Sequence, residues 1–569
     1  MMTPIARARW TRGLITAALV AATAGVLGVP GQTAAPRFYP DDPIAREPES
    51  QDASKAKVYE IEQMFEMVRN LFVTPDYKPS GARAANINTI DEVPDSSWFT
   101  NRVGSKPITI EELVKGPVEG APPDPSHWVL TREKTTGAHP GFTARDAKGD
   151  TWFLEFDPPY FAEGATGAVE VATKIFWGLG YHQVESFLTT FDPKKASIDP
   201  EASLRRPSGK RTPFRQDDVN AILERVHRNK DGTYRVIAGR LIGGRILGNF
   251  TFDGSRTDDP NDIVPHERRR ELRALRVFGA WTNLTDLKSA NTLDSLVTVN
   301  GRSTIKHYLQ DVGSTFGMCN ELYEWDLSYE NFVQGDTTLR RLASFGFALS
   351  PWQTVDYVEY PSVGKFEGDV FDPRKWRPQT TTVGYLEMRD DDAFWAARRV
   401  VAFSDEMIRA AVHTGQFSNP DAEKYLADVL IKRKKKIAEA YLPAINPIVE
   451  PRLDGNGGRL TFTNAAVDAG VAKPPASYVA VWSSFDNTTN ESTPIADTTS
   501  ATPAMQAPAG LPTMPGSFVA IDISANDTAH PTWKTPIRTH FRRDGATWTL
   551  VGLERLPENV PANPTAARR

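Results

Sequence analysis

The sequence predicts an α+β protein in which a mixed core is followed by a C-terminal all-β sandwich module. Three observations support this. The chain has 569 residues, which is too long for one ordinary core. Strand-like runs and helical periodicities alternate through residues 126–446. Residues 447–569 then carry only short strand-like runs between turn-rich polar segments, a pattern typical of a small β-sandwich.

Composition excludes several classes of protein. Hydrophobic residues make up 40% and charged residues 24% of the chain, close to soluble globular averages. Disorder and a multi-span membrane protein are therefore not expected. The net charge is −5, which provides no basic field to gather nucleic acid, so we expect no nucleic-acid partner. The single cysteine, Cys319, excludes an internal disulfide.

Residues 1–34 have the order of a secretory signal peptide. Arg7, Arg9 and Arg12 precede an apolar run from Leu14 to about Val29, and small residues follow. The run is short for a membrane-spanning helix, which needs about 20 residues. We therefore expect export to the periplasm or the extracellular space, with no transmembrane span after signal cleavage. An uncleaved anchor is the alternative.

Residues 35–125 are expected to be a linker and an N-terminal extension. The stretch 36–57 is rich in proline and acidic residues, which is typical of linkers. Apolar residues at helical spacing predict a helix over 58–73.

The first part of the core, residues 126–250, is expected to be mostly β-sheet. Strand-like runs at 128–133, 141–146 and 151–156 are separated by glycine-bearing turns, which predicts an antiparallel meander. A helix is expected over 164–181 and another strand over 233–244.

The second part, residues 251–446, is expected to be mostly helical. A long helix is predicted over 265–281, with its leucines on one face and its arginines mostly on another. Asn300-Gly301 between two strand-like runs predicts a β-hairpin. Two further helices are expected, over 392–412 and 420–442.

The stretch TDLKSANTL, residues 285–293, has the spacing of a phosphoryl-transfer loop. Such chemistry needs an acid near the acceptor hydroxyl, together with a second acid and an amide that hold a metal ion. In kinases these come from D-x-x-x-x-N and a later D-x-G, joined by a hairpin. Asp286 and Asn291 have that spacing, and the predicted hairpin leads to Asp311 and Gly313.

These motifs, DLKSAN followed by DVG, resemble those of the protein-kinase-like superfamily. The order of elements over about residues 128–442 is similar to its atypical bacterial and secreted branches, such as the CotH-like and HipA-like kinases. The resemblance implies a two-lobed core, with a small lobe at about 126–250 and a large lobe at about 251–446, and it implies ATP with Mg²⁺ or Mn²⁺ as cofactors.

The resemblance also implies residue roles. Asp286 would be the catalytic-loop acid and Lys288 a contact to the γ-phosphate. Asn291 and Asp311 would hold the metal. Glu170 would match the helix glutamate that kinases pair with a strand lysine.

The sequence departs from the kinase pattern at the strand that normally carries this lysine. Glu155 stands there, and a carboxylate would repel phosphates unless a cation lies between. Either Lys134 or Lys174 reaches the nucleotide instead, or the site has no catalytic activity.

Each motif also has a simpler interpretation. Asp286 could cap the preceding helix, Asn291 and Asp311 could be turn residues, and Lys288 and Glu170 could be solvated. The basic run 432–436 is more typical of a solvated helix face than of a surface for an anionic partner. The acids near residue 260, with His266, could bind a divalent ion, although helix N-termini attract acids anyway.

The sequence thus predicts an exported, metal-dependent phosphotransferase that moves a phosphoryl group from ATP to an unknown acceptor. The alternative is a pseudokinase or ligand-binding envelope protein without catalysis. The C-terminal module is expected to contact the cell envelope.

Overall fold

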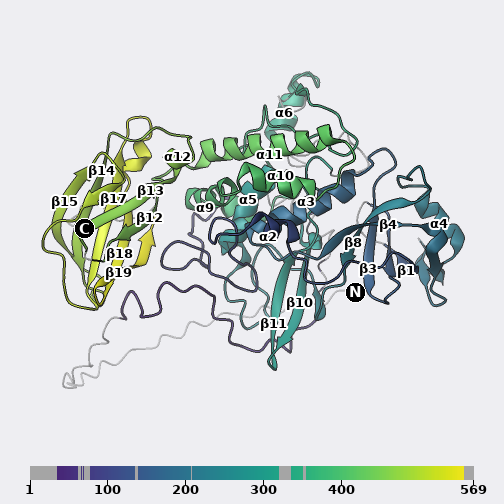
Figure 1. Ribbon diagram of the computed structural model, residues 1–569, viewed down its shortest axis with the longest axis horizontal. Helices are drawn as coiled ribbons and strands as arrows, with labels where there is room; N and C mark the ends of the chain where they lie inside the picture. Colours follow the sequence, from purple (N-terminus) through teal and green to yellow (C-terminus); the bar gives the residue numbers. More distant parts are fainter. Residues whose placement is uncertain are drawn as a thin grey trace, which may run out of the picture.

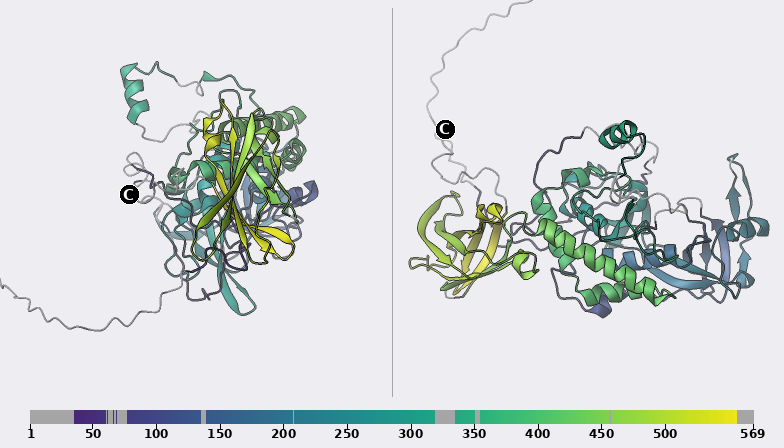
Figure 2. Two further views of the ribbon diagram at one scale, coloured as in Figure 1. Left: turned by 90° about the vertical axis from the view of Figure 1, so that its left-hand side faces the viewer. Right: turned by 90° about the horizontal axis from the view of Figure 1, so that it is seen from above.

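The structure is a computed structural model that describes residues 35–59, 61, 66, 68, 77–134, 139–206, 208–318, 335–349, 354–455 and 457–555. The predicted signal peptide, nearly all of the helix expected over 58–73 and Cys319 lie outside the described residues. The described chain is a mixed α+β protein with several sheets (Figures 1 and 2).

A six-stranded sheet in the order β4-β8-β3-β2-β1-β5 forms the right-hand part of Figure 1. Its neighbouring strands are antiparallel except β1 and β5, which are parallel. The expected meander is confirmed as β1, β2 and β3. The strands are β1 (Trp128–Glu133), β2 (Gly141–Arg145), β3 (Thr151–Phe156), β4 (Ser186–Phe191), β5 (Ala196–Ile198) and β8 (Tyr234–Arg240).

The two faces of this sheet have different surroundings. Along β3, Trp152, Leu154 and Phe156 are buried in a core that also contains residues of α4 (Gln216–Leu223). Phe153 and Glu155 alternate with them and so lie on the opposite face, as the two-residue period of a strand requires. A small pair of strands, β6 (Ser203–Arg205) and β7 (Arg211–Pro213), lies beside this core.

Helix α3 (Gly164–Leu179) confirms the helix expected after the meander. Nearly all its residues are buried, and they contribute to the large core that it shares with the later helices. It ends at Gly180, whose φ of 121° and close approach to the Phe99 ring leave no room for a Cβ atom.

The predicted hairpin is confirmed as β10 (Thr292–Val299) and β11 (Arg302–Leu309), which β9 (Arg245–Gly248) extends to three strands. Asn300 and Gly301 both have positive φ, of 52° and 78°, as a two-residue hairpin turn requires.

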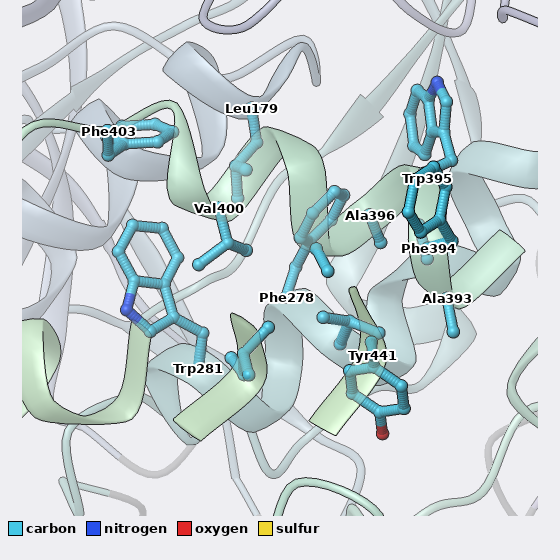
Figure 3. Packing of buried hydrophobic residues seen from close by; sticks show 14 of the residues in the cluster. Leu179, Phe278, Trp281, Ala393, Phe394, Trp395, Ala396, Val400, Phe403 and Tyr441 are labelled. Atoms are coloured by element: carbon cyan, nitrogen blue, oxygen red, sulfur yellow. The ribbon is translucent and has the colours of Figure 1, made fainter. Parts of the chain in front are cut away.

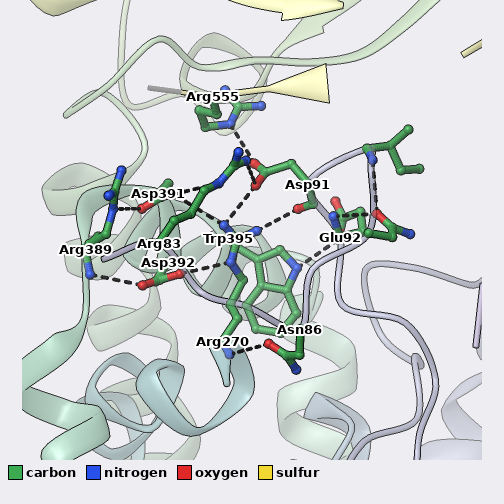
Figure 4. Close-up of polar contacts among 12 residues, drawn as sticks. Arg83, Asn86, Asp91, Glu92, Arg270, Arg389, Asp391, Asp392, Trp395 and Arg555 are labelled. Carbon is green, nitrogen blue, oxygen red and sulfur yellow. Dashed lines mark hydrogen bonds and ion pairs between the residues drawn. The ribbon is translucent and has the colours of Figure 1, made fainter. Parts of the chain in front are cut away.

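The long helix expected over 265–281 differs from the prediction in its start. A short 3₁₀ turn (His266–Arg268) precedes α5 (Arg270–Thr282). Arg269, Arg270 and Arg273 are buried, because carboxylates from distant parts of the chain pair with them. Figure 4 shows part of this network.

The helix expected over 392–412 is two helices. Ser404 caps a new start because its hydroxyl accepts a hydrogen bond from the Met407 backbone, so that α9 and α10 are separate. Together with α5, α9 and α10, helix α11 builds the core shown in Figure 3. The helices of this body are α2 (Ile110–Lys115), α6 (Gly335–Ala343), α8 (Val383–Glu387), α9 (Asp390–Val401), α10 (Asp405–His413) and α11 (Pro420–Tyr441).

The basic run on α11 is engaged within the molecule. Arg433 is buried and stacks on the Phe366 and Phe371 rings, with its guanidinium carbon 4.1 Å and 4.3 Å from their centroids. Lys434 pairs with Asp405 at 2.6 Å. Arg433 and Lys434 therefore belong to the packing, whereas Lys432 and Lys435 are exposed, as the solvated helix face predicts.

Residues 447–555 form two antiparallel sheets, in the orders β12-β13-β16 and β15-β14-β17-β18-β19, at the left of Figure 1. Both contribute to the large core, and their face-to-face packing as a sandwich stays a prediction. The elements are β12 (Ile448–Leu453), β13 (Arg459–Asn464), α12 (Ala465–Asp468), β14 (Ser477–Phe485), β15 (Ser492–Ser500), β16 (Ala504–Gln506), β17 (Phe518–Asn526), β18 (Ile537–Asp544) and β19 (Thr547–Glu554).

The stretch expected to be a linker, residues 36–57, is mostly exposed and irregular, but a few of its side chains are buried against the rest of the chain. Phe38 is buried among Phe485, Phe518 and neighbours of the C-terminal sheet. Ala53 and Ala56 are buried against the hairpin. The composition suggested a linker, but a few small or aromatic side chains are enough to fix an extended segment on a surface.

No helix in the described part of the chain is long and apolar enough to cross a membrane.

Candidate functional site

A cavity of about 370 Å³ lies between the open face of the six-stranded sheet, α3 and the loop after α5. Its walls bring together residues that are far apart in the sequence, from β1 to the end of β11. The polar residues of its lining include Lys134, Glu155, Lys288, Asn291 and Asp311. The apolar residues of its lining include Phe153, Val184, Ile237, Leu241, Ile242, Ile246 and Leu293.

The apolar residues of the loop after α5 anchor it to the large core. Helix α5 stops at Asn283, which adopts a left-handed conformation with φ of 59°. Leu284 and Leu287 are buried in the large core, whereas Asp286 and Lys288 are only partly buried. This alternation anchors the loop to the core and leaves the two charged side chains on its opposite, less buried side.

The hairpin brings Asn291 beside Asp311. The backbone N–H groups of Gln310 and Asp311 both donate to the Asn291 carbonyl oxygen at 3.0 Å. Ladder pairing of Thr292 with Leu309 continues this contact into the sheet. Two motifs that are 20 positions apart in the sequence therefore share one corner of the cavity.

Asp286 is joined to the same corner. Its carboxylate lies 2.7 Å from the Lys288 ammonium. Its carbonyl oxygen accepts a hydrogen bond of 2.7 Å from the Asn291 side-chain amide. That bond fixes the amide, whose oxygen accepts no hydrogen bond from the described part of the chain. Asp286 itself stands just outside the cavity walls.

Asp311 lines the cavity and its side chain is exposed there, although many protein atoms surround its carboxylate. Desolvation by the surrounding protein, together with the charge of Glu155, raises the pKa of Asp311. Its Oδ1 accepts a hydrogen bond of 3.0 Å from the Gly313 backbone. No cation within ion-pair distance of Asp311 is found in the described part of the chain.

Gly313 allows the motif to approach α3. A Cβ atom there would lie 2.9 Å from Val169, which also lines the cavity.

Glu155, the departure from the kinase pattern, pairs with Lys134 at 2.8 Å. Lys134 directly follows β1, and both side chains line the cavity. The charge of Lys134 also lowers the pKa of Asp311, against the larger effect of burial. A lysine from the end of β1 therefore provides a positive charge in the cleft, and the β3 carboxylate orients it.

Glu170 and Lys174 lie behind the wall rather than in it. Their side chains pair with each other at 3.0 Å, one turn apart on α3, and both are buried. Ser186, which does line the cavity, donates a hydrogen bond of 3.1 Å to Glu170. Of the two lysines proposed to reach a nucleotide, the geometry favours Lys134.

Glu66 was not predicted from the sequence. Its carboxylate accepts hydrogen bonds from the Ser289 backbone at 3.1 Å and from the Ser289 hydroxyl at 2.9 Å. Ser289 lies between Lys288 and Asn291. Because Glu66 is more than 200 positions away, no local spacing in the sequence could have revealed this contact.

The residues present fit a divalent cation. Mg²⁺ and Mn²⁺ prefer oxygen ligands, and the corner offers the Asp311 carboxylate and the unoccupied amide oxygen of Asn291. Among the described residues, no cluster of three or more His, Cys, Asp or Glu side chains is placed to bind a metal ion. An ion held by two protein ligands would complete its coordination with phosphate oxygens and water.

The other acid-rich stretch is not such a site. Asp262 pairs with His266 at 2.7 Å, and both are buried. His266 also stands against the Trp98 ring, with centroids 4.6 Å apart. These contacts are those of a packed interior.

Comparison with known proteins finds similarity only among solved structures. No family model matches the chain, and no curated protein matches it. The chain is similar to two crystal structures of the Golgi casein kinase, one of them with Mn/ADP bound. Identity is 10% and 11%, coverage is 70% of this chain and 96% of that chain, and the TM-score is 0.27 in each case. A TM-score at this level does not establish a shared fold.

Proposed function

We propose that this chain is a metal-dependent phosphotransferase that moves a phosphoryl group from ATP to an acceptor hydroxyl. One observation carries the proposal. Lys288, Asn291 and Asp311 line one cavity, and Asp286 contacts Lys288 and Asn291 just outside its walls. The apolar residues of the lining suit a purine base, and its charged and amide groups suit phosphates.

The side chains divide the work of the reaction. Asp311 and Asn291 would hold Mg²⁺ or Mn²⁺. A bound divalent ion neutralises phosphate charge and orients the phosphates. Asp286 accepts the proton of the acceptor hydroxyl, because its carboxylate stands beside Lys288 and just outside the cavity walls, where an acceptor can approach. Lys288, held at 2.7 Å from Asp286, faces the transferred phosphoryl group.

Lys134 takes the part that a strand lysine plays in kinases. In the cleft the Lys134 ammonium would contact the phosphates nearest the base, while its ion pair with Glu155 holds the Lys134 side chain in place. Glu170 and Lys174 neutralise each other behind the wall and keep α3 in place.

The fold supports the same proposal at a coarser level. The core under the six-stranded sheet and the core of the helical body are separate clusters, and the cavity lies between the elements that carry them. We propose that they are the small and large lobes of an atypical kinase-like core, related to the CotH-like or HipA-like branch. We further propose that the protein is exported and that a C-terminal β-sandwich contacts the cell envelope.

Glu155 supports a second candidate function, a pseudokinase that binds a ligand without chemistry. Its carboxylate occupies the place where kinases have a cation, and it uses the charge of Lys134 for its own neutralisation. The two functions differ only in whether phosphoryl transfer occurs.

Transfer can be tested with ATP labelled in the γ-phosphate and Mn²⁺. The enzyme proposal predicts slow Mn²⁺-dependent release of labelled phosphate to water or to the chain itself. Asp286→Asn should reduce that rate at least about a hundredfold, as expected for loss of a general base. Asp217→Asn, an exposed acid at the start of α4, is the matched control and should leave the rate unchanged. Binding of nucleotide without any release would favour the pseudokinase.

A further inference from the structure

A second, larger cavity lies on the other side of the segment that leaves β8. Its volume is about 660 Å³, and its walls come from α2 and the residues around it, the end of α3, the segment before β4 and strand β11. It shares Val184, Arg240, Leu241 and Ile242 with the first cavity. The two cavities are therefore neighbours that are separated by the same short stretch of chain.

Two cations in this cavity have no carboxylate partner within the described part of the chain. Arg102 donates to the backbone carbonyl of Trp177 at 2.8 Å and stacks on its ring, with its guanidinium carbon 4.3 Å from the centroid. Lys306 is 5.3 Å from the Tyr308 ring centroid. Burial lowers the pKa of Arg102 to about 10, and burial also lowers the pKa of Lys306. Protein groups therefore leave positive charge uncompensated here.

The acids that line the cavity are mostly engaged elsewhere. Glu112 accepts a hydrogen bond of 2.7 Å from the Thr109 backbone and so completes the cap of α2. Glu185 pairs with Arg240 at 3.3 Å. Glu119 is exposed and acts on Lys306 from a distance, which raises the pKa of that lysine. Lys306 is thus influenced by the exposed Glu119, and Arg102 by the charge of Asp95, which lies outside the cavity lining.

The floor of the cavity carries buried polar groups without partners. Gln183 is 5% exposed, and neither its amide nitrogen nor its amide oxygen has a hydrogen-bond partner. His182, which is 8% exposed, leaves its Nε2 unpartnered as well. Burial and the charges of Lys306 and Arg102 lower the pKa of His182, so its ring is neutral. Buried amides in native proteins nearly always have partners, and none for the Gln183 amide is found in the described part of the chain.

We infer that this cavity binds a small organic anion, with its acid group against Lys306 and Arg102 and its hydroxyl or amide groups against Gln183. The charge requires an acid, and the unpartnered amide requires a group that both donates and accepts. The volume lies within the range of small-molecule sites. This inference does not depend on the proposed phosphotransfer.

The acid group of the ligand is either a phosphate or a carboxylate, and calorimetric titration distinguishes them. The probes are glucose 6-phosphate, glucuronate and, as a neutral counterpart, glucose, all with metal chelated to exclude the first cavity. At least one anionic sugar should bind once per chain, at least tenfold more tightly than glucose. If neither anion binds better than glucose at millimolar concentration, the inference is wrong.

Substitutions test the place of binding. Lys306→Met keeps the aliphatic stem but removes the charge, and affinity should fall at least tenfold. Lys148→Met is the matched control and should not change affinity, because Lys148 is exposed and lines neither cavity. Equal affinity in the Lys306→Met variant and the parent would overturn the assignment.

Gln183→Leu separates a binding role from a structural one. If the amide serves a ligand, the variant should bind the anion at least fivefold more weakly and should melt no earlier than the parent. Unchanged affinity with a lower melting temperature would contradict the inference. Asp311→Asn should retain anion binding, so failure of the proposed phosphotransfer would leave this result intact.

Discussion

Two regions of this molecule, a buried network and the cleft, differ in how their charged side chains are paired. In the network of Figure 4, Arg270 lies 2.9 Å from Asp91 and 3.0 Å from Asp392, and its side chain is fully buried. In the cleft, Asp311 lies near Glu155 and Asp286 without a cation of its own. The network pairs its charges internally, whereas the cleft leaves an acid unpaired.

The pKa values follow this difference. Burial opposes ionisation of Asp391, but the charges of Arg270, Arg389 and Arg83 lower its pKa. Burial and a neighbouring acid raise the pKa of Asp311. Paired buried charge fixes a structure, whereas unpaired charge in an open cavity indicates that something else is to be bound.

The largest effect is expected in the network. Arg270→Met keeps most of the side-chain volume but leaves three acids without their shared partner, Asp91, Asp391 and Asp392. The free energy of unfolding should fall by about 3–5 kcal/mol, as measured when one member of a buried ion pair is removed. Urea denaturation followed by tryptophan fluorescence measures it.

The matched control is Arg409→Met, because Arg409 pairs with Asp428 on the surface and both side chains are well exposed. An exposed pair contributes about 0–1 kcal/mol. If both substitutions lower the free energy of unfolding by the same amount, the proposed difference between buried and exposed ion pairs is wrong.

The cost of Arg270→Met should depend on pH. The pKa of Asp391 is lowered in the folded state, so its contribution is present above about pH 4, the unfolded value, and is lost as pH falls through the folded value. The difference in unfolding free energy between parent and variant should therefore shrink below about pH 4. A difference that is constant from pH 7 to pH 3 would mean that the network does not depend on ionised acids.

In the cleft, Asp311→Asn should affect ligand binding rather than folding. Without metal the free energy of unfolding should change by less than about 0.5 kcal/mol, because no ion pair is broken. With Mn²⁺ and ADP at a hundred times the dissociation constant, the parent should gain about 2.7 kcal/mol and the variant nothing. Thermal unfolding with and without the two ligands measures both. Equal ligand stabilisation of parent and variant would remove Asp311 from the site.

Lys134→Met should have a smaller effect. Loss of one charge-assisted contact to a phosphate costs about 1.5 kcal/mol, or roughly tenfold in nucleotide affinity. Lys134→Met combined with Glu155→Met should bind ADP better than the single variant, because the unpaired carboxylate is also removed. Fluorescence titration with a labelled nucleotide measures this. If the double variant binds no better than Lys134→Met alone, Glu155 does not act on the phosphates.

Local patterns in the sequence predicted the elements that depend on short-range physics. The meander, α3, the Asn300-Gly301 hairpin and α11 follow from periodicity and turn chemistry, and the structure confirms them. The break between α9 and α10 was missed because one serine cap, Ser404, ends a continuous helical pattern. The burial of Arg270 and Arg273 in α5 could not be read from local spacing, because their acidic partners Asp91 and Asp392 lie more than 100 positions away.

In the candidate site, too, some features follow from local spacing and others depend on tertiary packing. Spacing alone identified Asp286, Asn291 and Asp311, and the hairpin explains why they meet. The pairing of Lys134 with Glu155, the position of Glu170 behind the wall and the contact of Glu66 with Ser289 depend on tertiary packing. A local spacing rule contains no information on these contacts.

Calorimetric titration of Mn²⁺ into the chain saturated with ADP tests most directly whether the unpaired acid of the cleft holds a cation. The account predicts binding of at least one Mn²⁺ per chain that is lost in Asp311→Asn, while Arg409→Met binds like the parent. Identical Mn²⁺ binding by the parent and Asp311→Asn, or no binding by either, would contradict it.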